Sequence, residues 1–358
     1  MRAFLISAFC SLVFLAGCAN QRVLDSIQLV QGLGYDLQNG KVAGAVIYPN
    51  FEEKGKVKLY MLKTLADSHE EVLTRLSTKV PNPIETGQLR MIIFGEAFAR
   101  QGIGNLLTNF SRISEIGSRT QLAVAEGTAE MIMKASTEVN IPFHLNSKIT
   151  QLIKFGDLPK MNLHIFLENL ASEGRDPYTA YYTIERGQIK VDGLALFRKA
   201  KFVDKISMKQ TFLLKMLMEG TQNGEYQMKI KENDKEGYVL LKNLKGRPRY
   251  CLQQTDGSPS FSIALSMKAQ IKALPPWFRM TENKDTIRLE KLIDERLRED
   301  LENLLDFLRK ENVDPIGFGD KVRAKSRNWD LNRFQALYPH MKTTVRAKVK
   351  IIQTGIVE

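Results

Sequence analysis

The chain has 358 residues, of which 43% are hydrophobic and 26% are charged. This length predicts roughly two to three domains at about 150 residues each, and the composition excludes disordered, collagen-like and multi-span membrane proteins. The 52 lysines and arginines outnumber the 40 acidic residues, and the formal charge of +12 favours an anionic partner such as nucleic acid or a membrane surface.

The first residues have the layout of an export signal. Arg2 precedes an uncharged, largely apolar stretch that ends in small residues, as in a secretory signal peptide. The sequence Leu15-Ala16-Gly17-Cys18 resembles a bacterial lipobox, where cleavage precedes a cysteine that carries diacylglycerol. We therefore expect residues 1–17 to be a lipoprotein signal peptide and Cys18 to be the lipidation site. One alternative is an uncleaved membrane anchor, but the apolar stretch is shorter than the ~20 residues needed to span a bilayer. The other alternative is that Cys18 follows a signal peptide by chance.

Lipidation would leave residues 19–358 outside the cytoplasmic membrane and tethered to it. An exported chain is not expected to meet nucleic acid, so we expect its positive charge to supplement the anchor. Cys10 is lost with the signal peptide and Cys18 is blocked, which leaves Cys251 without a partner cysteine. We expect Cys251 to be a small, buried, unreactive side chain.

Strand-like and helix-like patterns are mixed in the first half of the mature chain. Helical spacing is found in the segments 72–80, 98–110 and 128–135. Strand patterns are found at 26–30, 32–36, 41–48, 89–94 and 121–125, the third of them ending at Pro49. This order predicts an α/β or α+β arrangement with helices covering a sheet.

A break is expected near residues 173–177, and the chain beyond it is richer in strands. One helix is expected at 212–218, and strands are expected at 178–184, 189–197, 202–206, 226–230, 237–241 and 261–271. In the last of these, the alternate residues Phe261, Ile263, Leu265 and Met267 share one face. We expect that face to be the buried side of a half-buried strand.

The clearest single element is a helix from about Thr286 to Glu311. Its apolar residues recur at spacings of three and four, and charged residues occupy the other face. The apolar stripe consists of Leu289, Leu292, Ile293, Leu297, Leu301, Leu304, Leu305 and Leu308. Such a stripe normally packs on a sheet, and a coiled-coil partner is the alternative.

The last strand alternates between apolar and basic residues. Val345, Ala347, Val349 and Ile351 point to one side, and the other side carries Arg346, Lys348 and Lys350. A solvated strand face explains this pattern. The alternative is a surface that meets anionic lipid or an acidic partner, so these three residues form a candidate membrane- or partner-facing site.

The sequence contains no recognised catalytic or metal-binding pattern. The four histidines are far apart, and H-E-x-x-H, C-x-x-C and G-x-S-x-G are all absent. The segment 34–41 departs from a phosphate-binding loop, because five residues separate its glycines and Val42 follows its lysine. We therefore expect no catalytic residues, no metal and no cofactor.

Several motifs follow the lipobox in a characteristic order. They are Leu29–Asp36 (LVQGLGYD), Met91–Ala99 (MIIFGEAFA), Val191–Arg198 (VDGLALFR), Asp314–Gly319 (DPIGFG) and a basic strand ending in Gln353-Thr354-Gly355. Together they resemble the Ger(x)C family of bacterial spore germination lipoproteins, the C subunits of nutrient germinant receptors. The chain departs from the family pattern at Ala19-Asn20, Gln88 and Asp204, which leaves the particular receptor open.

The resemblance implies a multi-domain α+β protein of about three domains. Its mixed or antiparallel sheets would be flanked by helices, and its C-terminal domain would contain the long amphipathic helix. We place an N-terminal α/β-type domain at 18–190, a small middle domain or connector at 191–225, and a C-terminal α+β domain at 226–358.

The resemblance also implies a function. The protein would be a lipid-anchored, non-enzymatic subunit on the outer face of the cytoplasmic (spore inner) membrane, acting with integral membrane A- and B-type subunits in nutrient-triggered germination. The main alternative is a solute-binding lipoprotein that feeds a membrane transporter. A lipid-anchored envelope hydrolase is a third hypothesis.

Overall fold

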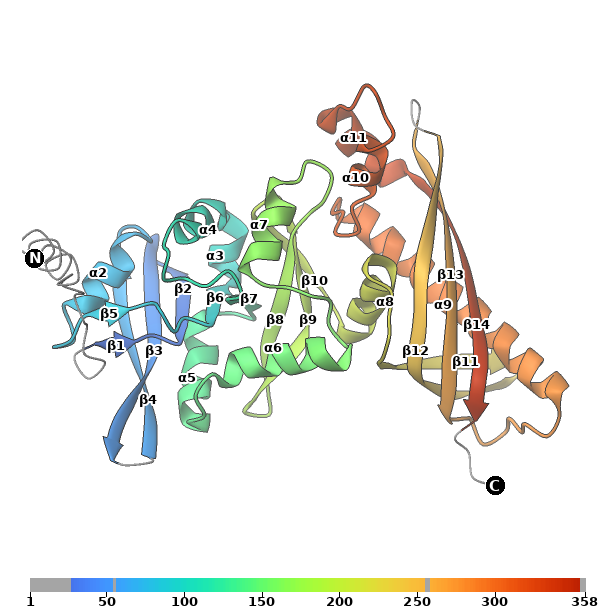
Figure 1. The fold of residues 1–358 in the computed structure, drawn as a ribbon, viewed down its shortest axis with the longest axis horizontal. Helices are drawn as coiled ribbons and strands as arrows, with labels where there is room; N and C mark the ends of the chain where they lie inside the picture. The colour runs from blue at the N-terminus through green and yellow to red at the C-terminus, as the bar shows by residue number, and fades with distance from the viewer. Residues whose placement is uncertain (1–26, 54–55, 255–257, 355–358) are drawn as a thin grey trace, which may run out of the picture.

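The computed structural model describes residues 27–53, 56–254 and 258–354, which form an elongated α+β protein built on two large sheets (Figure 1). The strands are β1 (Gln28–Leu29), β2 (Gly32–Gln38), β3 (Lys41–Glu53), β4 (Lys56–Ala66), β5 (Ile84–Glu85), β6 (Met91–Gly95), β7 (Gln121–Ala125), β8 (Tyr178–Glu185), β9 (Gln188–Arg198), β10 (Lys201–Ile206), β11 (Glu225–Glu232), β12 (Lys235–Gln254), β13 (Ser260–Ala273) and β14 (Lys342–Thr354). The helices are α2 (Glu71–Ser77), α3 (Glu96–Gln101), α4 (Gly104–Ser111), α5 (Ala129–Val139), α6 (His144–Phe155), α7 (Leu163–Ala171), α8 (Met208–Met218), α9 (Asn283–Lys310), α10 (Phe318–Arg323), α11 (Leu331–Leu337) and the short 3-10 helix η2 (Tyr338–His340).

The first sheet has eight strands in the order β10-β9-β8-β7-β6-β2-β3-β4. Its four central strands, β8, β7, β6 and β2, are parallel, and antiparallel hairpins extend it at both edges. The central strands are buried on both faces, as parallel strands usually are. Side chains from α2, α3, α4 and α7 pack against one face, and α5 and α6 cover the other.

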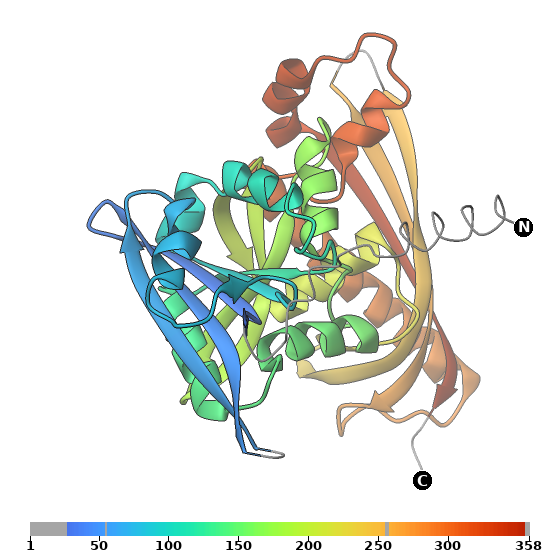
Figure 2. The ribbon, with the colours of Figure 1, turned by 60° about the vertical axis from the view of Figure 1, so that its left-hand side comes forward.

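The second sheet has four strands in the order β11-β12-β13-β14, with β13 and β14 parallel. Its inner face packs against α9, which crosses the strands along most of its length (Figures 1 and 2). The predicted stripe of α9 is confirmed, because every member except the half-buried Leu292 is buried. The inner face of β13 is also as predicted, since Phe261, Ile263, Leu265 and Met267 are at most 3% exposed.

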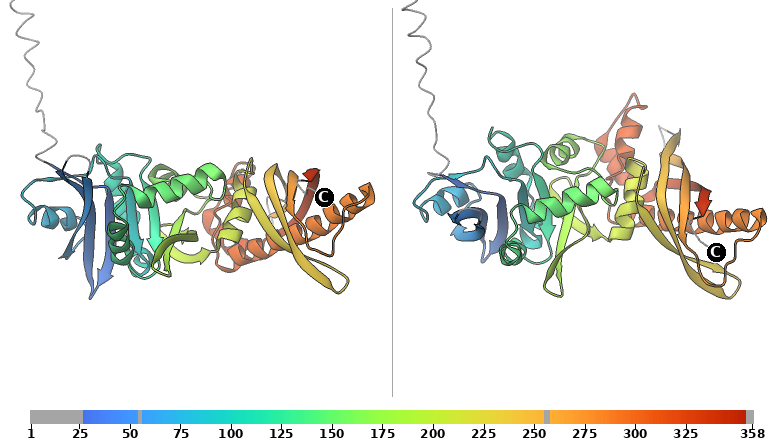
Figure 3. Two further views of the ribbon diagram at one scale, coloured as in Figure 1. Left: turned by 90° about the horizontal axis from the view of Figure 1, so that it is seen from below. Right: turned by 60° about the horizontal axis from the view of Figure 1, so that its bottom comes forward.

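Helix α8 connects the two sheets. All side chains from Thr211 to Leu217 are buried, and the helix contacts β9, β12 and α9. A single cluster of apolar side chains runs from the α5 side of the first sheet through α8 to α9 and the second sheet. The two ends of the elongated molecule, seen from below in Figure 3, therefore share one continuous core.

Strand β9 contains the boundary expected between residues 190 and 191. It pairs with β8 on one side and with β10 on the other, so the first sheet extends to Ile206. The α+β fold class, with helices flanking mixed sheets and one long helix near the C-terminus, is confirmed. The division into three domains stays a prediction from the sequence.

The single helix expected over 98–110 is in fact two helices, α3 and α4. Gly102 lies between them with a φ of +118°, a conformation that favours glycine. The turn between β9 and β10 packs into this break, where Ala200 O accepts a hydrogen bond from Ile103 N at 2.9 Å. A tertiary contact therefore interrupts an apolar pattern that is helical by period.

Two further expectations were wrong. Strand β3 does not end at Pro49 but continues to Glu53, because its pairing with β2 ends at Ile47 and the missing N–H of Pro49 costs no ladder bond on that side. Cys251 is exposed rather than buried. It pairs with Ser262 on the outer face of the second sheet, whereas its neighbours on β12 point inward.

Candidate functional site

The candidate lipidation site, Cys18, and the signal peptide at 1–17 lie outside the described residues. Within the described ranges, no helix combines the length and the apolar character needed to cross a bilayer. Attachment to a membrane through Cys18 thus stays a prediction.

The alternation predicted for the last strand is present in β14. Arg346, Lys348 and Lys350 are exposed, while Val345 and Val349 are buried on the inner face. Among the strands that the structure describes, none pairs with the outer edge of β14. Its main chain is satisfied by the long helix instead, because Asp294 and Glu290 of α9 accept hydrogen bonds from Val349 N (2.6 Å) and Ile351 N (2.8 Å). This arrangement protects an edge that could otherwise pair with another chain.

The carboxyl edge of the first sheet is where open α/β sheets usually bind ligands. Here Asp36 at the end of β2 occupies that position. Its two carboxylate oxygens accept hydrogen bonds from Ala129 N (2.7 Å) and Glu130 N (2.9 Å) in the first turn of α5. Helix N-termini attract anions. The Asp36 carboxylate therefore occupies the position at the N-terminus of α5 where a phosphate ligand would otherwise bind. Gly95 on β6 permits this, because a Cβ there would lie 2.1 Å from Asp36 Oδ1.

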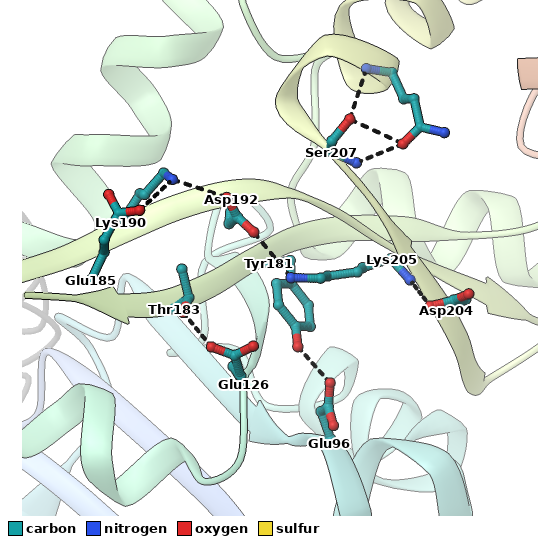
Figure 4. A network of polar contacts seen from close by, with 11 residues as sticks. Glu96, Glu126, Tyr181, Thr183, Glu185, Lys190, Asp192, Asp204, Lys205 and Ser207 are labelled. Carbon is teal, nitrogen blue, oxygen red and sulfur yellow. Dashed lines mark hydrogen bonds and ion pairs between the residues drawn. The ribbon is translucent and has the colours of Figure 1, made fainter.

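A network of polar side chains joins β8, β9 and β10 to the adjacent helix α3 (Figure 4). The Tyr181 hydroxyl donates to Glu96, and Lys205 lies 4.6 Å from the centre of the Tyr181 ring. Lys205 also donates to Asp192 at 3.0 Å, and Lys190 lies 3.2 Å from the same carboxylate. The strands at this edge are thus cross-linked by charged hydrogen bonds.

Two groups of this network have pKa values that are shifted away from neutrality. Burial and the hydrogen bond to Glu96 raise the pKa of Tyr181 well above its usual range. Burial favours protonation of Asp192, but hydrogen bonds from Lys205 and Lys190 outweigh it and lower the pKa of Asp192. Among the described residues, no three His, Cys, Asp or Glu side chains gather closely enough to hold a metal ion.

Two aspartates join the first half of the chain to the second. Asp176, just before β8, donates from its backbone N to Asp314 O at 2.9 Å. Its carboxylate accepts from Asp314 N at 2.8 Å and from Lys199 N at 3.1 Å. Asp176 therefore connects the segment before β8, the β9–β10 turn and the segment after α9.

Asp314 in turn organises the start of α10. Its carboxylate oxygens accept from Gly317 N and Gly319 N, both at 2.9 Å, and the side chain is buried. Burial raises the pKa of Asp314 to about 7. The motif DPIGFG found in the sequence is thus a self-capped turn. It packs directly on Gly174, whose O accepts from Asp320 N at 3.0 Å.

An open cleft of about 320 Å³ lies at this junction. Its walls include Arg175, Arg198, Lys199, Phe334 and Tyr338. The volume is near the lower end for ligand pockets. A second hollow of about 520 Å³ shares Arg198 and Lys199 with it. Asn312 also lines both hollows, so they lie between the β9–β10 turn and the segment that follows α9.

Sequence reasoning identified part of this architecture. The break at 173–177 and the DPIGFG motif were both recognised, but nothing in the sequence indicated that they touch. The role of Asp36 was also missed, although it ends the motif LVQGLGYD. In each case the sequence contained a glycine-containing motif, but the segment that contacts this motif lies far away along the chain.

Comparisons with known proteins agree with this architecture. The model of the "Spore germination protein N-terminal domain" matches residues 20–184, and that of the "Spore germination B3/GerAC like, C-terminal" domain matches residues 192–355. Spore germination protein GerQC of Bacillus cereus is 30% identical, with 97% of each chain covered. This chain belongs to the Ger(x)C family of spore germination proteins. The prediction made from the sequence motifs is confirmed.

More distant family members show the same full-length correspondence. Spore germination protein KC of Bacillus subtilis (strain 168) is 22% identical, over 97% of this chain and 94% of that protein. The crystal structure of the GerBC protein superposes with a TM-score of 0.56, at 19% identity, over 90% of this chain and 97% of that one. At 19% identity, the structural similarity to GerBC is evidence for the fold of this Ger(x)C protein alone.

Proposed function

We propose that this Ger(x)C protein is a lipid-anchored, non-enzymatic C subunit of a spore nutrient germinant receptor. It would act beside integral membrane A- and B-type subunits on the outer face of the spore inner membrane. The observation that carries the proposal is the match of both halves of the chain to spore germination domains. The lipobox ending at Cys18 supports the anchor.

The described structure suits a role in docking and assembly. The usual ligand position at the carboxyl edge of the first sheet is filled by Asp36, and the polar network near Tyr181 serves to cross-link strands. The two halves are joined by a continuous core and by the Asp176–Asp314 junction. Confinement of such a rigid body to a membrane plane would raise its effective concentration near membrane partners.

The experiment that tests this proposal replaces Cys18 by alanine in a spore former. Membrane retention of the protein and nutrient-triggered germination are measured in the same spores. Cys251→Ala is the matched control, because Cys251 is a free, exposed cysteine that lies outside the lipobox. We expect Cys18→Ala protein to be synthesised, to leave the membrane fraction and to lower germination, while Cys251→Ala spores behave as wild type.

Normal membrane retention and normal germination of the Cys18→Ala spores would contradict the proposal. The solute-binding alternative makes a different prediction, because such proteins usually have two α/β lobes around a cleft. The second half of this chain has a four-stranded sheet and one long helix instead. Tight binding of a nutrient to the purified protein by calorimetry would favour that alternative.

A further inference from the structure

The outer face of the second sheet carries far more positive charge than β14 alone suggests. Three adjacent strands, β12, β13 and β14, contribute exposed cations to it. The eight exposed cations of this basic face are Lys245, Arg247, Arg249, Lys268, Lys342, Arg346, Lys348 and Lys350.

The register of the strands arranges these side chains in rows across the sheet. Arg249, Ala264 and Arg346 form one row, and the next two are Arg247-Ser266-Lys348 and Lys245-Lys268-Lys350. Neighbouring strands are separated by about 4.8 Å, and residues two apart on a strand by roughly 6.7 Å. The basic face is therefore a dense array of charges on a regular, extended support.

Acidic residues are rare on the three strands that carry these charges, although β11 at the far edge of the sheet has Glu225 and Glu232. Glu236 is the one acidic residue in β12, β13 and β14, and it pairs with Lys229 of β11. Within the described residues, none of the eight cations forms an ion pair. Glu290 and Asp294 of α9 lie at the edge of β14, where their carboxylates accept from its main chain. Self-repulsion among so many unpaired cations favours contact with an extended anionic surface.

The residues between the cations indicate what kind of surface that is. Ala264, Ser266, Ser262 and Thr344 are small, so the basic face offers no aromatic anchor within its rows. Cores of protein–protein interfaces are enriched in aromatic residues and depleted in lysine. A bilayer surface needs no such anchor, because its headgroups present delocalised negative charge and each lysine or arginine beside it adds to binding independently.

We propose that the basic face binds the anionic phospholipid headgroups of the membrane. The proposal deepens the membrane-anchored role given above and rests on it. β1 and the second sheet lie at opposite ends of the long axis (Figure 1). A lipid anchor that precedes β1 and a basic face on the second sheet would therefore contact the membrane at two separated points. Together they would restrict the orientation of the elongated protein more than a single point of attachment would.

The test uses an unlipidated chain of residues 19–358, which contains every described helix and strand. Its binding to vesicles of phosphatidylcholine, with and without phosphatidylglycerol, is measured by co-sedimentation. We expect binding only to the vesicles that contain phosphatidylglycerol. Binding should weaken as salt shortens the Debye length from about 10 Å at 0.1 M to about 3 Å at 1 M.

Charge removal at defined positions makes the test specific. The variant Arg249→Gln/Arg346→Gln/Lys348→Gln removes three cations of the basic face. The control Arg112→Gln/Lys134→Gln/Lys154→Gln removes three exposed cations from α4, α5 and α6 and their ends. At about fivefold per cation, we expect the first variant to lose on the order of 100-fold in vesicle affinity. We expect the control variant to bind nearly as well as wild type, and thermal unfolding should show both variants folded.

Three outcomes would overturn the proposal. One is equal binding to both kinds of vesicle, and another is equal weakening in both variants. The third is normal vesicle binding by the first variant together with reduced germination, which would assign the basic face to an acidic protein partner. The unlipidated protein of residues 19–358 lacks Cys18, so the vesicle result is independent of the lipidation test. The two proposals can therefore fail separately.

Discussion

Asp176 and Asp314, 138 residues apart, hold each other through paired hydrogen bonds in which each backbone N–H donates to the other residue. The N–H of Asp176 donates to the carbonyl oxygen of Asp314, and the N–H of Asp314 donates to the carboxylate of Asp176. The contact joins the loop before β8 to the turn that starts α10. It lies at the meeting point of the two segments matched by separate family models. The packing around this pair makes the junction sensitive to very small changes.

Gly174→Ala should weaken this junction. A Cβ at Gly174 would lie 2.2 Å from Asp320 N and 2.4 Å from Gly319 C, both backbone atoms that cannot move aside. We expect the two segments to be forced apart, with a loss of about 1–3 kcal/mol in the free energy of unfolding, as for other overpacked sites. Urea unfolding monitored by circular dichroism measures the loss.

Gly87→Ala is the matched control for this change. Gly87 is exposed, and a Cβ there would meet no atom within 4 Å. We expect its stability to stay within about 0.5 kcal/mol of wild type. Equal stability of the Gly174→Ala and Gly87→Ala proteins would show that the junction is not closely packed in solution.

Asp314 should make stability depend on pH. Burial raises its pKa to about 7, whereas an aspartate in an unfolded chain titrates near 3.9. Between these values the folded protein retains a proton that the unfolded chain releases. The contribution of Asp314 to the free energy of unfolding therefore falls as pH rises from about 4 to about 7, by on the order of 4 kcal/mol, and is level above that range.

Asp314→Asn separates this effect from other titrating groups. The amide keeps one acceptor for the turn and loses the titration, so we expect a less stable protein whose pH profile is flatter between about pH 4 and 7. Denaturant unfolding at several pH values measures the slope. Parallel profiles for the variant and the wild type would rule out Asp314 as the source.

Local patterns in the sequence predicted the elements whose burial is one-sided or complete. β7 was expected at 121–125 and is found at Gln121–Ala125, and the stripe of α9 and the inner face of β13 were also identified. These elements bury whole faces, so apolar spacing follows the period of the backbone. The helices α6 and α7 were missed. α6 buries only Leu145 and Ile149, so little apolar periodicity marks it, and the buried positions of α7 include the polar Asn169.

The long-range contacts could not be predicted in this way. The pairing of Asp176 with Asp314 and that of Asp36 with the N-terminus of α5 depend on segments that meet only in the folded chain. The outward position of Cys251 depended on the register of β12 against β13. The motifs that carry the family resemblance marked several of these places, because close backbone approaches require glycine there.

Asp36→Ala tests the carboxylate that caps α5. Both of its oxygens are hydrogen-bonded and the side chain is buried, so removal leaves two backbone N–H groups without their acceptor. We expect a loss of about 2–3 kcal/mol in the free energy of unfolding. Lys63→Met is the control, because it breaks the exposed Lys63–Glu130 ion pair on the same helix and should cost under about 1 kcal/mol. Similar losses in both would contradict a special role for Asp36.

Asp300 on α9 tests the connection between the long helix and α8. Its carboxylate accepts from Tyr226 Oη at 2.7 Å and lies 2.9 Å from Lys209 Nζ and 2.6 Å from Arg296. Burial opposes ionisation of Asp300, but the hydrogen bonds from Lys209 and Tyr226 prevail and lower its pKa. The ionised carboxylate therefore stabilises the fold above about pH 4, and this contribution is lost as pH falls through the lowered pKa.

Asp300→Asn removes the charge while keeping the size of the side chain. We expect a loss toward the lower end of the ~3–5 kcal/mol seen when one partner of a buried ion pair is removed, because Lys209 and Arg296 retain partial access to solvent. Glu302→Gln on the same helix breaks the more exposed pair with Arg298 and should cost only about 0.3–0.5 kcal/mol. Urea unfolding at pH 7 distinguishes the two. If both variants were equally stable, the Asp300 cluster would be no more than a surface ion pair, and the apolar core alone would connect α8 to α9.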